Sequence, residues 1–263
     1  MSNVKGNRRL ELDWNGEQIM VSESLPPETR AETPTAYFFH GIGDTSASFE
    51  QLIDKTTKSG FQCITCDLPG FGCNSSIHLC FDDLVNFCQH LIRRTDGERP
   101  RVFVGHSFGG LLLLLCLQGV EISDDDKVVV IEGSLTEADY GFFKWINEPP
   151  VGIGFEEFLA RGKRREDPRS RMFFPRVEAS NRDVFLEYAK TVYSSFWKFR
   201  EKIKESSIEF YYIMGEESIG KEKREEIGED PCVSLVRISN AQHWVHLDNP
   251  EEFFEWFAST ILR

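Results

Sequence analysis

The sequence GHSFG at residues 105–109 places a serine between two glycines, each two positions away. A β-branched and aromatic run at 102–104 precedes it, and a leucine-rich stretch at 111–117 follows it. In this strand–turn–helix order, the pattern G-x-S-x-G holds a serine on a bend so sharp that its hydroxyl projects above the sheet edge. Glycines flank the serine because side chains there would collide with the bend. The pattern predicts Ser107 as a nucleophile; in the simpler interpretation it only caps the following helix.

A serine hydroxyl attacks a carbonyl near pH 7 only when a base within hydrogen-bond reach takes its proton. Histidine suits this role because it titrates near neutrality and can both accept and return a proton. The chain has six histidines, and two of them, His243 and His246, follow the last predicted strand and compete for the role. We interpret His40 as part of a glycine loop and His106 as packing beneath the serine turn.

A carboxylate usually orients the catalytic histidine, and Glu132, Glu216 and Glu217 are the candidates. The run Val-Val-Val-Ile at 128–131 predicts a buried strand that delivers Glu132 to the carboxyl edge of a sheet. Sites in open α/β sheets form at that edge. Glu216 and Glu217 follow a different predicted strand, 208–214. All three satisfy the chain order serine, acid, histidine, and a site that lacks the acid is the remaining alternative.

Acyl transfer also needs backbone N–H groups directed at the negative charge that develops on the carbonyl oxygen. The geometry of a G-x-S-x-G turn supplies one such group from the residue after the serine, Phe108. We expect the second from Ile42, which lies in the His-Gly-Ile-Gly loop at 40–43, directly after a predicted buried strand. The simpler interpretation of that loop is a glycine turn without function.

These residues need a scaffold of alternating strands and helices. An Asn15-Gly16 turn joins two predicted strands of an N-terminal hairpin, because Asn-Gly is a strong signal for a two-residue turn. The further predicted strands cover 35–40, 61–66, 102–104, 127–131, 208–214 and 233–238, and the predicted helices between and after them cover 46–58, 77–94, 111–117 and 251–262. Alternating strands and helices predict an α/β protein with a mostly parallel sheet covered on both faces.

The stretch from Gly133 to about residue 207 has no strand pattern. We interpret 133–207 as an inserted helical cap, and residues 1–132 and 208–263 as the core domain. Many aromatic residues in the cap predict an apolar pocket roof that sets substrate choice. A basic cluster, Arg161–Arg171, is the dense positive patch of an acidic chain; it is either a solvated helix surface or a guide for an anionic substrate.

Composition excludes several classes of function. The net charge of −13 argues against binding to nucleic acid or to anionic membrane surfaces. The polar N-terminus has no signal-peptide pattern, and the longest apolar run, 111–117, is too short to span a membrane. Seven irregularly spaced cysteines predict free thiols and a cytoplasmic protein. Cys63 and Cys66 form C-x-x-C, but residues three apart on a strand face opposite sides, so we expect no metal and no cofactor.

Four motifs occur in order, each after a predicted strand: HGIG at 40–43, DLPGFG at 67–72, GHSFG at 105–109 and HWVHLDNPE at 243–251. Together they resemble the α/β-hydrolase superfamily, within the capped esterase, haloalkane dehalogenase-like and epoxide hydrolase-like group. This resemblance implies an α/β-hydrolase fold with a mostly parallel, eight-stranded sheet and an inserted helical cap. The dehalogenase-like and epoxide hydrolase-like members have aspartate at the nucleophile position, so Ser107 implies acyl chemistry.

The resemblance also bears on the base and the acid. In the family the base stands before an aromatic residue, which favours His243, followed by Trp244, over His246. Many members place the acid three residues after a glycine that follows the seventh strand, but that position holds Ser218 here. Some dehalogenase-like members use a glutamate after the sixth strand instead. We therefore favour Glu132 as the acid and keep Glu217 or Glu216 as alternatives.

The expected function is a serine hydrolase that cleaves a carboxylic ester or thioester through an acyl-enzyme intermediate, without a metal or cofactor. The expected partner is a small acyl substrate with an apolar group, and neither nucleic acid nor stable membrane insertion is expected. Two alternatives remain open at this stage. One is a non-catalytic ligand-binding or scaffold protein on a hydrolase fold, and the other is a lyase or C–C hydrolase that uses the same triad.

Overall fold

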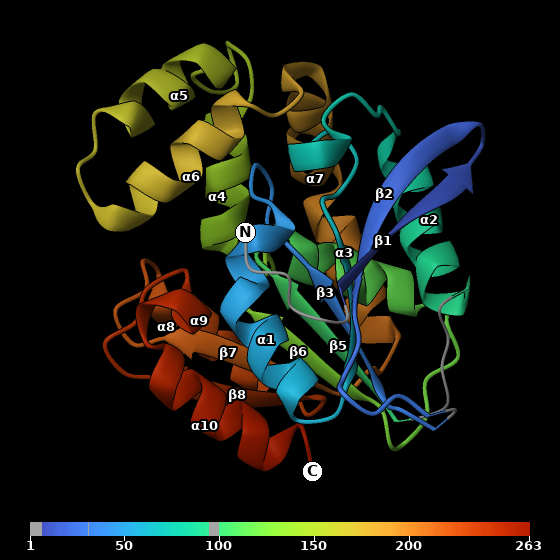
Figure 1. Cartoon of the computed structure of the whole chain (residues 1–263). Helices are drawn as coiled ribbons and strands as arrows, with labels where there is room; N and C mark the ends of the chain where they lie inside the picture. Colours follow the sequence, from blue (N-terminus) through green and yellow to red (C-terminus); the bar gives the residue numbers. More distant parts are fainter. Residues whose placement is uncertain (1–6, 31, 95–99) are drawn as a thin grey trace.

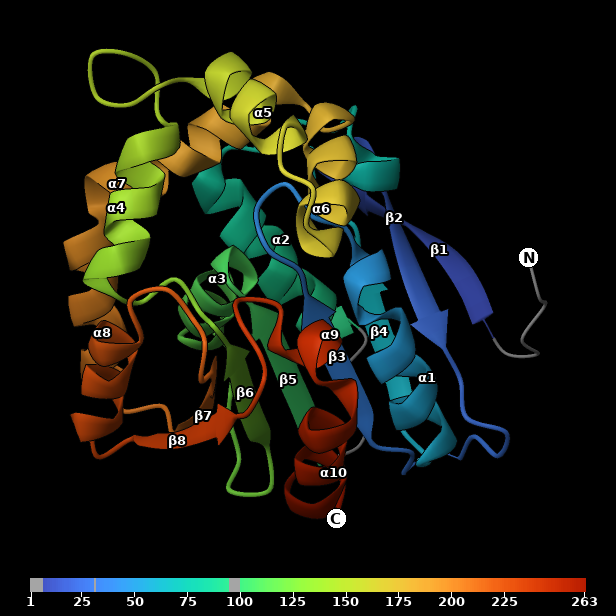
Figure 2. The same cartoon turned by 90° about the vertical axis from the view of Figure 1, so that its left-hand side faces the viewer.

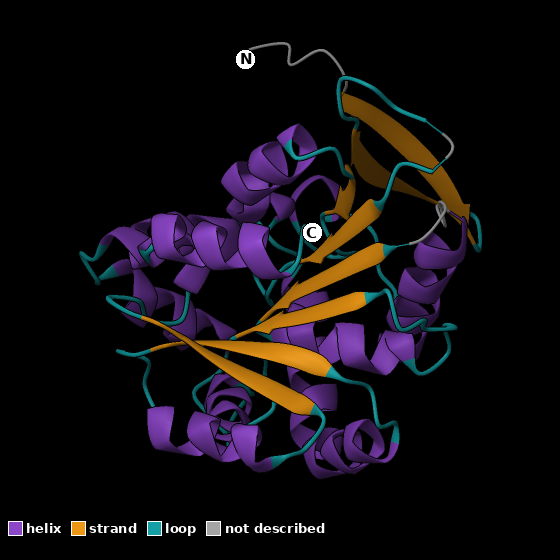
Figure 3. Cartoon of the chain, turned by 90° about the horizontal axis from the view of Figure 1, so that it is seen from below, coloured by secondary structure: helices purple, strands orange, loops and turns teal. Residues whose placement is uncertain are grey.

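An eight-stranded sheet with helices on both faces forms the centre of the molecule (Figures 1 and 3). The computed structural model describes residues 7–30, 32–94 and 100–263. The strand order is β1-β2-β4-β3-β5-β6-β7-β8. The hairpin strands β1 and β2 are antiparallel to their neighbours, and the six strands from β4 to β8 are parallel. The predicted fold class is therefore confirmed.

The strands are β1 (Asn7–Trp14), β2 (Glu17–Ser24), β3 (Thr35–Phe39), β4 (Gln62–Cys66), β5 (Arg101–His106), β6 (Lys127–Ile131), β7 (Phe210–Gly215) and β8 (Val233–Ile238). The helices are α1 (Glu50–Lys58), α2 (Phe81–Arg94), α3 (Phe108–Leu117), α4 (Glu137–Ile146), α5 (Phe155–Lys163), α6 (Pro168–Glu178), α7 (Arg182–Glu205), α8 (Lys221–Glu225), α9 (Val245–Asp248) and α10 (Pro250–Thr260).

The Asn-Gly signal of the hairpin is realised in the backbone. Asn15 and Gly16 both have positive φ angles, 53° and 89°, and Trp14 pairs with Glu17 across the turn. Both central residues of a type I′ turn need positive φ, and asparagine followed by glycine meets this need at low steric cost. The hairpin joins the parallel part of the sheet where β2 pairs with β4.

Two apolar layers hold the helices to the sheet. On one face Phe49, which precedes α1, joins Leu52 of α1 and Phe253 and Phe257 of α10 in a core cluster with side chains of the central strands. On the other face α2, α3 and α7 pack together, and every residue of α3 is buried. A helix buried on all sides must be apolar all round, which explains its run of leucines. Among the described residues, none of the helices combines the length and the hydropathy that a membrane span requires.

The segment between β6 and β7 holds four consecutive helices, α4 to α7, and its described residues form no strand. Figures 1 and 2 show α5 and α6 above the carboxyl ends of the central strands. Helix α7 also packs on the core helix α3, where Tyr188 stacks on Phe108 with ring centroids 5.8 Å apart. The helical content agrees with the predicted cap, while its separation from the core at residues 133 and 207 stays a prediction.

Candidate active site

Ser107 occupies the turn between β5 and α3 with φ 54° and ψ −121°, a conformation that a non-glycine residue adopts only under strain. Its N–H donates to the Ile131 carbonyl at 2.9 Å, and its carbonyl accepts from the N–H of Ser134 at 3.1 Å. These bonds to the residues around the end of β6 hold the strained turn in place. A Cβ atom on Gly105 would lie 2.6 Å from the Gly109 oxygen, so the flanking glycines are a steric requirement of the bend.

The loop that follows β3 lies directly beside Ser107. A Cβ atom on Gly41 would come within 3.3 Å of the Ser107 Cβ atom. The ring of His40 holds this loop, because Nε2 accepts from the Leu68 N–H and Nδ1 lies 2.8 Å from the Gly41 carbonyl. Burial lowers the pKa of His40, so the ring stays neutral and its Nδ1–H donates to that carbonyl.

The two backbone N–H groups predicted for the oxyanion hole belong to Ile42 in this loop and to Phe108 at the start of α3. Within the described part of the chain, neither group donates a backbone hydrogen bond. The first N–H groups of a helix have no partner within the helix, so Phe108 is free to bind an anion. Both side chains are buried, which leaves the backbone as the part that can serve a ligand.

His243 follows β8 and lies against the residue that precedes the serine. His106 Nε2 donates to the His243 carbonyl at 2.9 Å, and the two imidazole rings are 4.8 Å apart. Burial lowers the pKa of His106 to about 3, so this ring is a neutral support. The His243 side chain keeps 34% of its surface exposed and is accessible to a substrate or to water.

The rival histidine, His246, lies in a different environment. Its side chain is buried, and its ring stacks on Phe49 with centroids 5.0 Å apart. Burial lowers the pKa of His246 well below its ordinary value, which removes its use as a base near neutral pH. The geometry therefore favours His243, as the sequence interpretation does.

Glu132 comes directly after β6, fully buried and with a positive φ of 46°. Its Oε1 accepts from the Gly215 N–H at 2.9 Å and from the Ser218 hydroxyl at 2.6 Å. Its Oε2 faces His243, with Nδ1 at 3.6 Å. Such catalytic contacts are often long without substrate and shorten when it binds. Glu132 is therefore the carboxylate that the structure brings to the candidate base.

The pKa of Glu132 lies below its ordinary value despite the burial. Loss of solvent acts to raise this pKa, and the neighbouring His243 and the positive charge of Arg224 outweigh that effect. The carboxylate is therefore ionised at neutral pH, as a group that stabilises an imidazolium must be.

The two alternative acids lie elsewhere. Glu216 and Glu217 are exposed, and their backbone N–H groups bond to the carbonyls of Ile238 and Ala241. Neither carboxylate has a contact with His243 among the described residues. Ser218, which stands at the family's usual acid position, is instead buried as a donor to Glu132. Where many family members have the acid, this chain has the Ser218 hydroxyl, which holds the carboxylate of Glu132.

No sequence pattern indicates Arg224, whose Nε lies 2.9 Å from Glu132 Oε2. The segment around it, KEKREE, has the composition of a solvated helix, and nothing in its spacing marks one arginine as buried. Two contacts of α6 with the core are also absent from the sequence patterns: Arg169 pairs with Asp248, and Arg176 pairs with Asp44. Asp44 follows the loop at 40–43, and Asp248 follows His243, so α6 is tied to both sides of the site.

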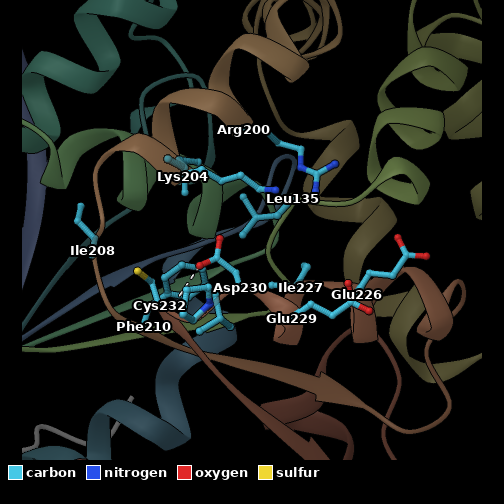
Figure 4. A pocket seen from close by; sticks show the side chains of 13 residues that line it. Leu135, Arg200, Lys204, Ile208, Phe210, Glu226, Ile227, Glu229, Asp230 and Cys232 are labelled. Carbon is cyan, nitrogen blue, oxygen red and sulfur yellow. Dashed lines mark hydrogen bonds between the residues drawn. The ribbon is translucent and has the colours of Figure 1, made fainter.

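The roof above the site is aromatic and closely packed. Phe173 of α6 lies 5.5 Å from the ring of Trp244, and a Cβ atom on Gly43 would contact Val177 and Phe185. The larger of the two best-formed cavities, about 350 Å³, lies elsewhere, between the end of α7 and the starts of β7 and β8 (Figure 4). Neither Ser107 nor His243 lines it. Ser107 is only partly exposed beneath this roof, so we expect movement of α6 to widen access to it.

Other sequence features do not contribute to this site. Cys63 and Cys66 belong to the two core clusters on opposite faces of the sheet, as the strand period predicts, and burial raises the pKa of the Cys63 thiol to about 12. Within the described ranges, no group of three or more histidine, cysteine or acidic side chains could hold a metal ion. Much of the basic cluster is paired: Arg161 with Glu157, Lys163 with Glu178, Arg165 with Asp167 and Arg169 with Asp248.

Comparison with known families matches residues 36–256 to the model of the alpha/beta hydrolase family. The chain belongs to the α/β-hydrolase family. Within this family it is 23% identical, over 86% of its own length and 96% of the relative's, to a Haemophilus influenzae protein provisionally named 2-succinyl-6-hydroxy-2,4-cyclohexadiene-1-carboxylate synthase.

Solved α/β-hydrolase structures share the whole architecture. An esterase from Exiguobacterium antarcticum superposes with a TM-score of 0.71 at 15% identity, covering 93% of this chain and 96% of the esterase. The haloalkane dehalogenase DatA from Agrobacterium tumefaciens has a TM-score of 0.72 at 14% identity, covering 97% and 96% of the two chains. MenH from S. aureus has a TM-score of 0.63 at 17% identity, covering 91% and 96%. At such low identity these matches establish the fold and leave the reaction open.

Proposed function

We propose that this protein is a serine hydrolase that cleaves a carboxylic ester or thioester of a small acyl substrate. In this reaction His243 takes the proton of the Ser107 hydroxyl, and the oxygen attacks the acyl carbon. Glu132 holds the imidazole through Nδ1 and stabilises the imidazolium that forms. The N–H groups of Ile42 and Phe108 bind the developing oxyanion. A water activated by His243 then releases the acid and restores the serine.

One observation carries this proposal. Three segments far apart in the chain meet at one point: the strained serine turn, the residue that follows β6, and the loop that follows β8. They meet as a buried, ionised carboxylate, Glu132, 3.6 Å from the imidazole of His243, whose backbone is bonded to the neighbour of Ser107. Burying an ionised carboxylate costs stability, and a buried carboxylate beside a partly exposed imidazole is typical of a functional site.

The surroundings support an apolar acyl group. Phe173 and Trp244 lie over the site, and Val177 closes on the loop that carries Ile42. Apolar walls with a few converging polar groups are typical of sites for small ligands. The proposed substrate is therefore an ester or thioester whose acyl chain or ring packs against these side chains.

A second candidate is a lyase-type reaction that uses the same serine, histidine and glutamate. The observation that favours it is the similarity to the Haemophilus influenzae protein named as a carboxylate synthase. In such an elimination His243 would take a proton from one carbon of the substrate, a double bond would form, and the group on the adjacent carbon would leave with its bonding electrons. No acyl-enzyme would form, so the two candidates differ in their covalent intermediate.

Labelling with a fluorophosphonate tests the proposal, because this probe reacts only with an activated serine. Wild type should be labelled at Ser107 and should hydrolyse members of a panel of acyl esters and thioesters. Ser107→Ala should lose both, with a fall in turnover on the order of 10⁴-fold or more. Ser76→Ala is the matched control, because Ser76 is exposed and should leave both unchanged.

Three results would separate the candidates. Labelling with ester turnover supports the hydrolase, and mass spectrometry of a slow substrate should then find Ser107 acylated. Labelling without turnover of any ester or thioester, together with elimination from a carboxylate-bearing substrate, would replace the hydrolase with the lyase-type reaction. Wild type that resists the probe would overturn both and leave a non-catalytic binding protein.

A further inference from the structure

A buried arginine lies beside the candidate acid. Arg224 belongs to α8, a short helix after β7, and only 6% of its side chain is exposed. It contacts carboxylates from two different segments, Glu132 after β6 and Asp139 in the first turn of α4. A buried charge costs several kcal/mol unless it is paired, so these contacts fix Arg224 in place.

The two terminal nitrogens of the guanidinium donate hydrogen bonds, whereas Nε contacts Glu132 as an ion pair without hydrogen-bond geometry. Nε lies 2.9 Å from Glu132 Oε2, the same oxygen that faces His243 Nδ1 at 3.6 Å. Nη2 donates to Asp139 Oδ1 at 3.0 Å, and Nη1 donates to the Tyr212 hydroxyl at 3.0 Å and to Asp139 Oδ2 at 3.3 Å. Arg224 and His243 thus share one carboxylate oxygen.

Asp139 is in turn part of the cap of α4. Its Oδ2 accepts from the Thr136 N–H at 2.8 Å and from the Thr136 hydroxyl at 2.7 Å. The Tyr212 hydroxyl donates to the carbonyl of Gly133, the residue after Glu132. The guanidinium therefore joins the turn that carries Glu132 to the start of the first helix of the cap.

We propose that Arg224 is a positioning residue that holds the Glu132 carboxylate in place and, together with Asp139, sets the proton affinity of the Glu132–His243 pair. This inference rests on the proposed function only for its catalytic consequence. The electrostatic part of the proposal concerns the protonation of Glu132 and His243, so it can be measured even in a protein without enzymatic activity.

The sign of the effect follows from charge. With Asp139 ionised and Arg224 protonated, the two charges offset each other beside Glu132. Removing the cation leaves an extra negative charge beside the pair, so the pair takes up its first proton at higher pH. Removing the Asp139 charge has the opposite sign. It should have the smaller effect because Arg224 stands between Asp139 and Glu132.

Other charged or titratable groups face the pair and must stay unchanged in the test. His106 packs on His243 from β5, and Tyr212 contacts Arg224 from β7. Burial lowers the pKa of His106 to about 3 and raises the pKa of Tyr212 well above its ordinary value, so both are neutral between pH 5 and pH 9. His246, also neutral through burial, lies behind His106 with ring centroids 5.2 Å apart.

The experiment is an NMR titration of the His243 ring in the intact chain, assigned by comparison with His243→Gln. Arg224→Met should move the His243 midpoint upward by about one pH unit. Asp139→Asn should move it downward by a smaller amount, and the double variant should fall between the single variants. Arg224→Lys keeps the charge and should titrate near wild type.

Midpoints within about 0.2 pH unit of wild type in both single variants would overturn the proposal and leave Arg224 as a packing residue. If Arg224→Met fails to fold, Asp139→Asn and Arg224→Lys decide: a downward shift in the first and no shift in the second support the proposal. An upward shift of the His243 midpoint in Asp139→Asn, or the same shift in both variants, contradicts it.

Turnover separates this inference from the proposed function. With an active wild type, Arg224→Met should lose about 10- to 100-fold in kcat, and the acid limb of its pH profile should move upward with the NMR midpoint. Shifted midpoints in a wild type that resists the fluorophosphonate would sustain the electrostatic claim and reject the hydrolase. Unshifted midpoints in an active enzyme would reject the electrostatic claim and sustain the hydrolase.

Discussion

The two sides of the candidate site are both held by arginine–carboxylate pairs, but in different surroundings. On one side Arg224 joins Glu132 to Asp139 with almost no exposed surface. On the other side α6 is tied down by Arg169 and Arg176, whose side chains are 31% and 22% exposed. We call the first the buried flank and the second the α6 flank.

The strength of an arginine–carboxylate pair depends on how much solvent reaches it. Charges in the buried flank attract each other with little screening, and separating them would strand a carboxylate without water. The Arg169–Asp248 pair is partly exposed on both sides, so salt screens it and it contributes about 1 kcal/mol or less, whereas Asp44 is buried and its pair with Arg176 is screened less. The same residue types therefore fix the acid on one flank and leave a breakable contact on the other. Because Phe173 and Val177 close the site from α6, the breakable flank is also where substrate is expected to enter.

The largest effect is expected from neutralising the acid of the buried flank. Glu132→Gln keeps the shape of the side chain but removes the charge that stabilises the imidazolium. We expect kcat to fall by about 10²- to 10⁴-fold, measured as ester turnover or as the rate of fluorophosphonate labelling.

Glu217→Gln is the matched control for the acid, because Glu217 is exposed and should tolerate the change within about two-fold. Ser218→Ala removes one of the two bonds to Glu132 Oε1 and should fall between these limits, with a loss of about ten-fold. Near-wild-type turnover by Glu132→Gln would reject Glu132 as the acid and, with it, the functional meaning of the buried flank.

The buried histidine beneath the serine turn, His106, should make the stability of the protein depend on pH. The pKa of His106 is lowered to about 3 in the folded protein, whereas the unfolded chain takes up this proton near pH 6.5. The unfolded state therefore binds more protons between these values, and the free energy of unfolding falls as pH drops from about 6.5 toward 3. The loss is on the order of 1 kcal/mol per pH unit for this one group.

His106→Gln keeps a donor for the His243 carbonyl but cannot titrate. Its free energy of unfolding, measured by urea denaturation between pH 6.5 and pH 4.5, should depend less steeply on pH than that of wild type. An equal slope in the two proteins would mean that His106 is protonated in the folded state and that its burial is not as described.

The smallest effect is expected on the α6 flank. Raising the salt concentration from 0.05 M to 1 M should increase the rate of fluorophosphonate labelling by about two- to five-fold, because screening weakens the partly exposed Arg169–Asp248 pair that holds α6 down. The double variant Arg169→Met and Arg176→Met should label at the faster rate already in low salt. Arg161→Met is the control, since Arg161 pairs with Glu157 of its own helix. A double variant that still responds to salt like wild type would show that α6 does not limit access.

Local sterics made much of the site predictable from sequence. A Cβ atom at Gly105 or Gly109 collides with backbone, so the turn around Ser107 can be recognised from its glycines. The positive φ angles of the hairpin turn likewise select Asn15 and Gly16. The β-branched run before Glu132 fixes where β6 ends, and a parallel strand that ends there delivers its next residue to the edge of the sheet.

The choice between candidates depended on contacts that no local pattern records. His243 and His246 differ by three positions in the chain, but one is partly exposed and the other lies between Phe49 and Phe253 in the core. Glu217 satisfies the same chain order as Glu132, yet its side chain faces solvent.

The amino-acid sequence alone predicts the sheet, the serine turn and a short set of possible partners, because these depend on backbone sterics and on the period of apolar residues. Which carboxylate meets His243, and the presence of Arg224 beside that carboxylate, follow from the packing of distant segments. Glu132 and Arg224 are brought together by the pairing of β6 with β7, and the burial that makes their charges matter is a property of the packed molecule.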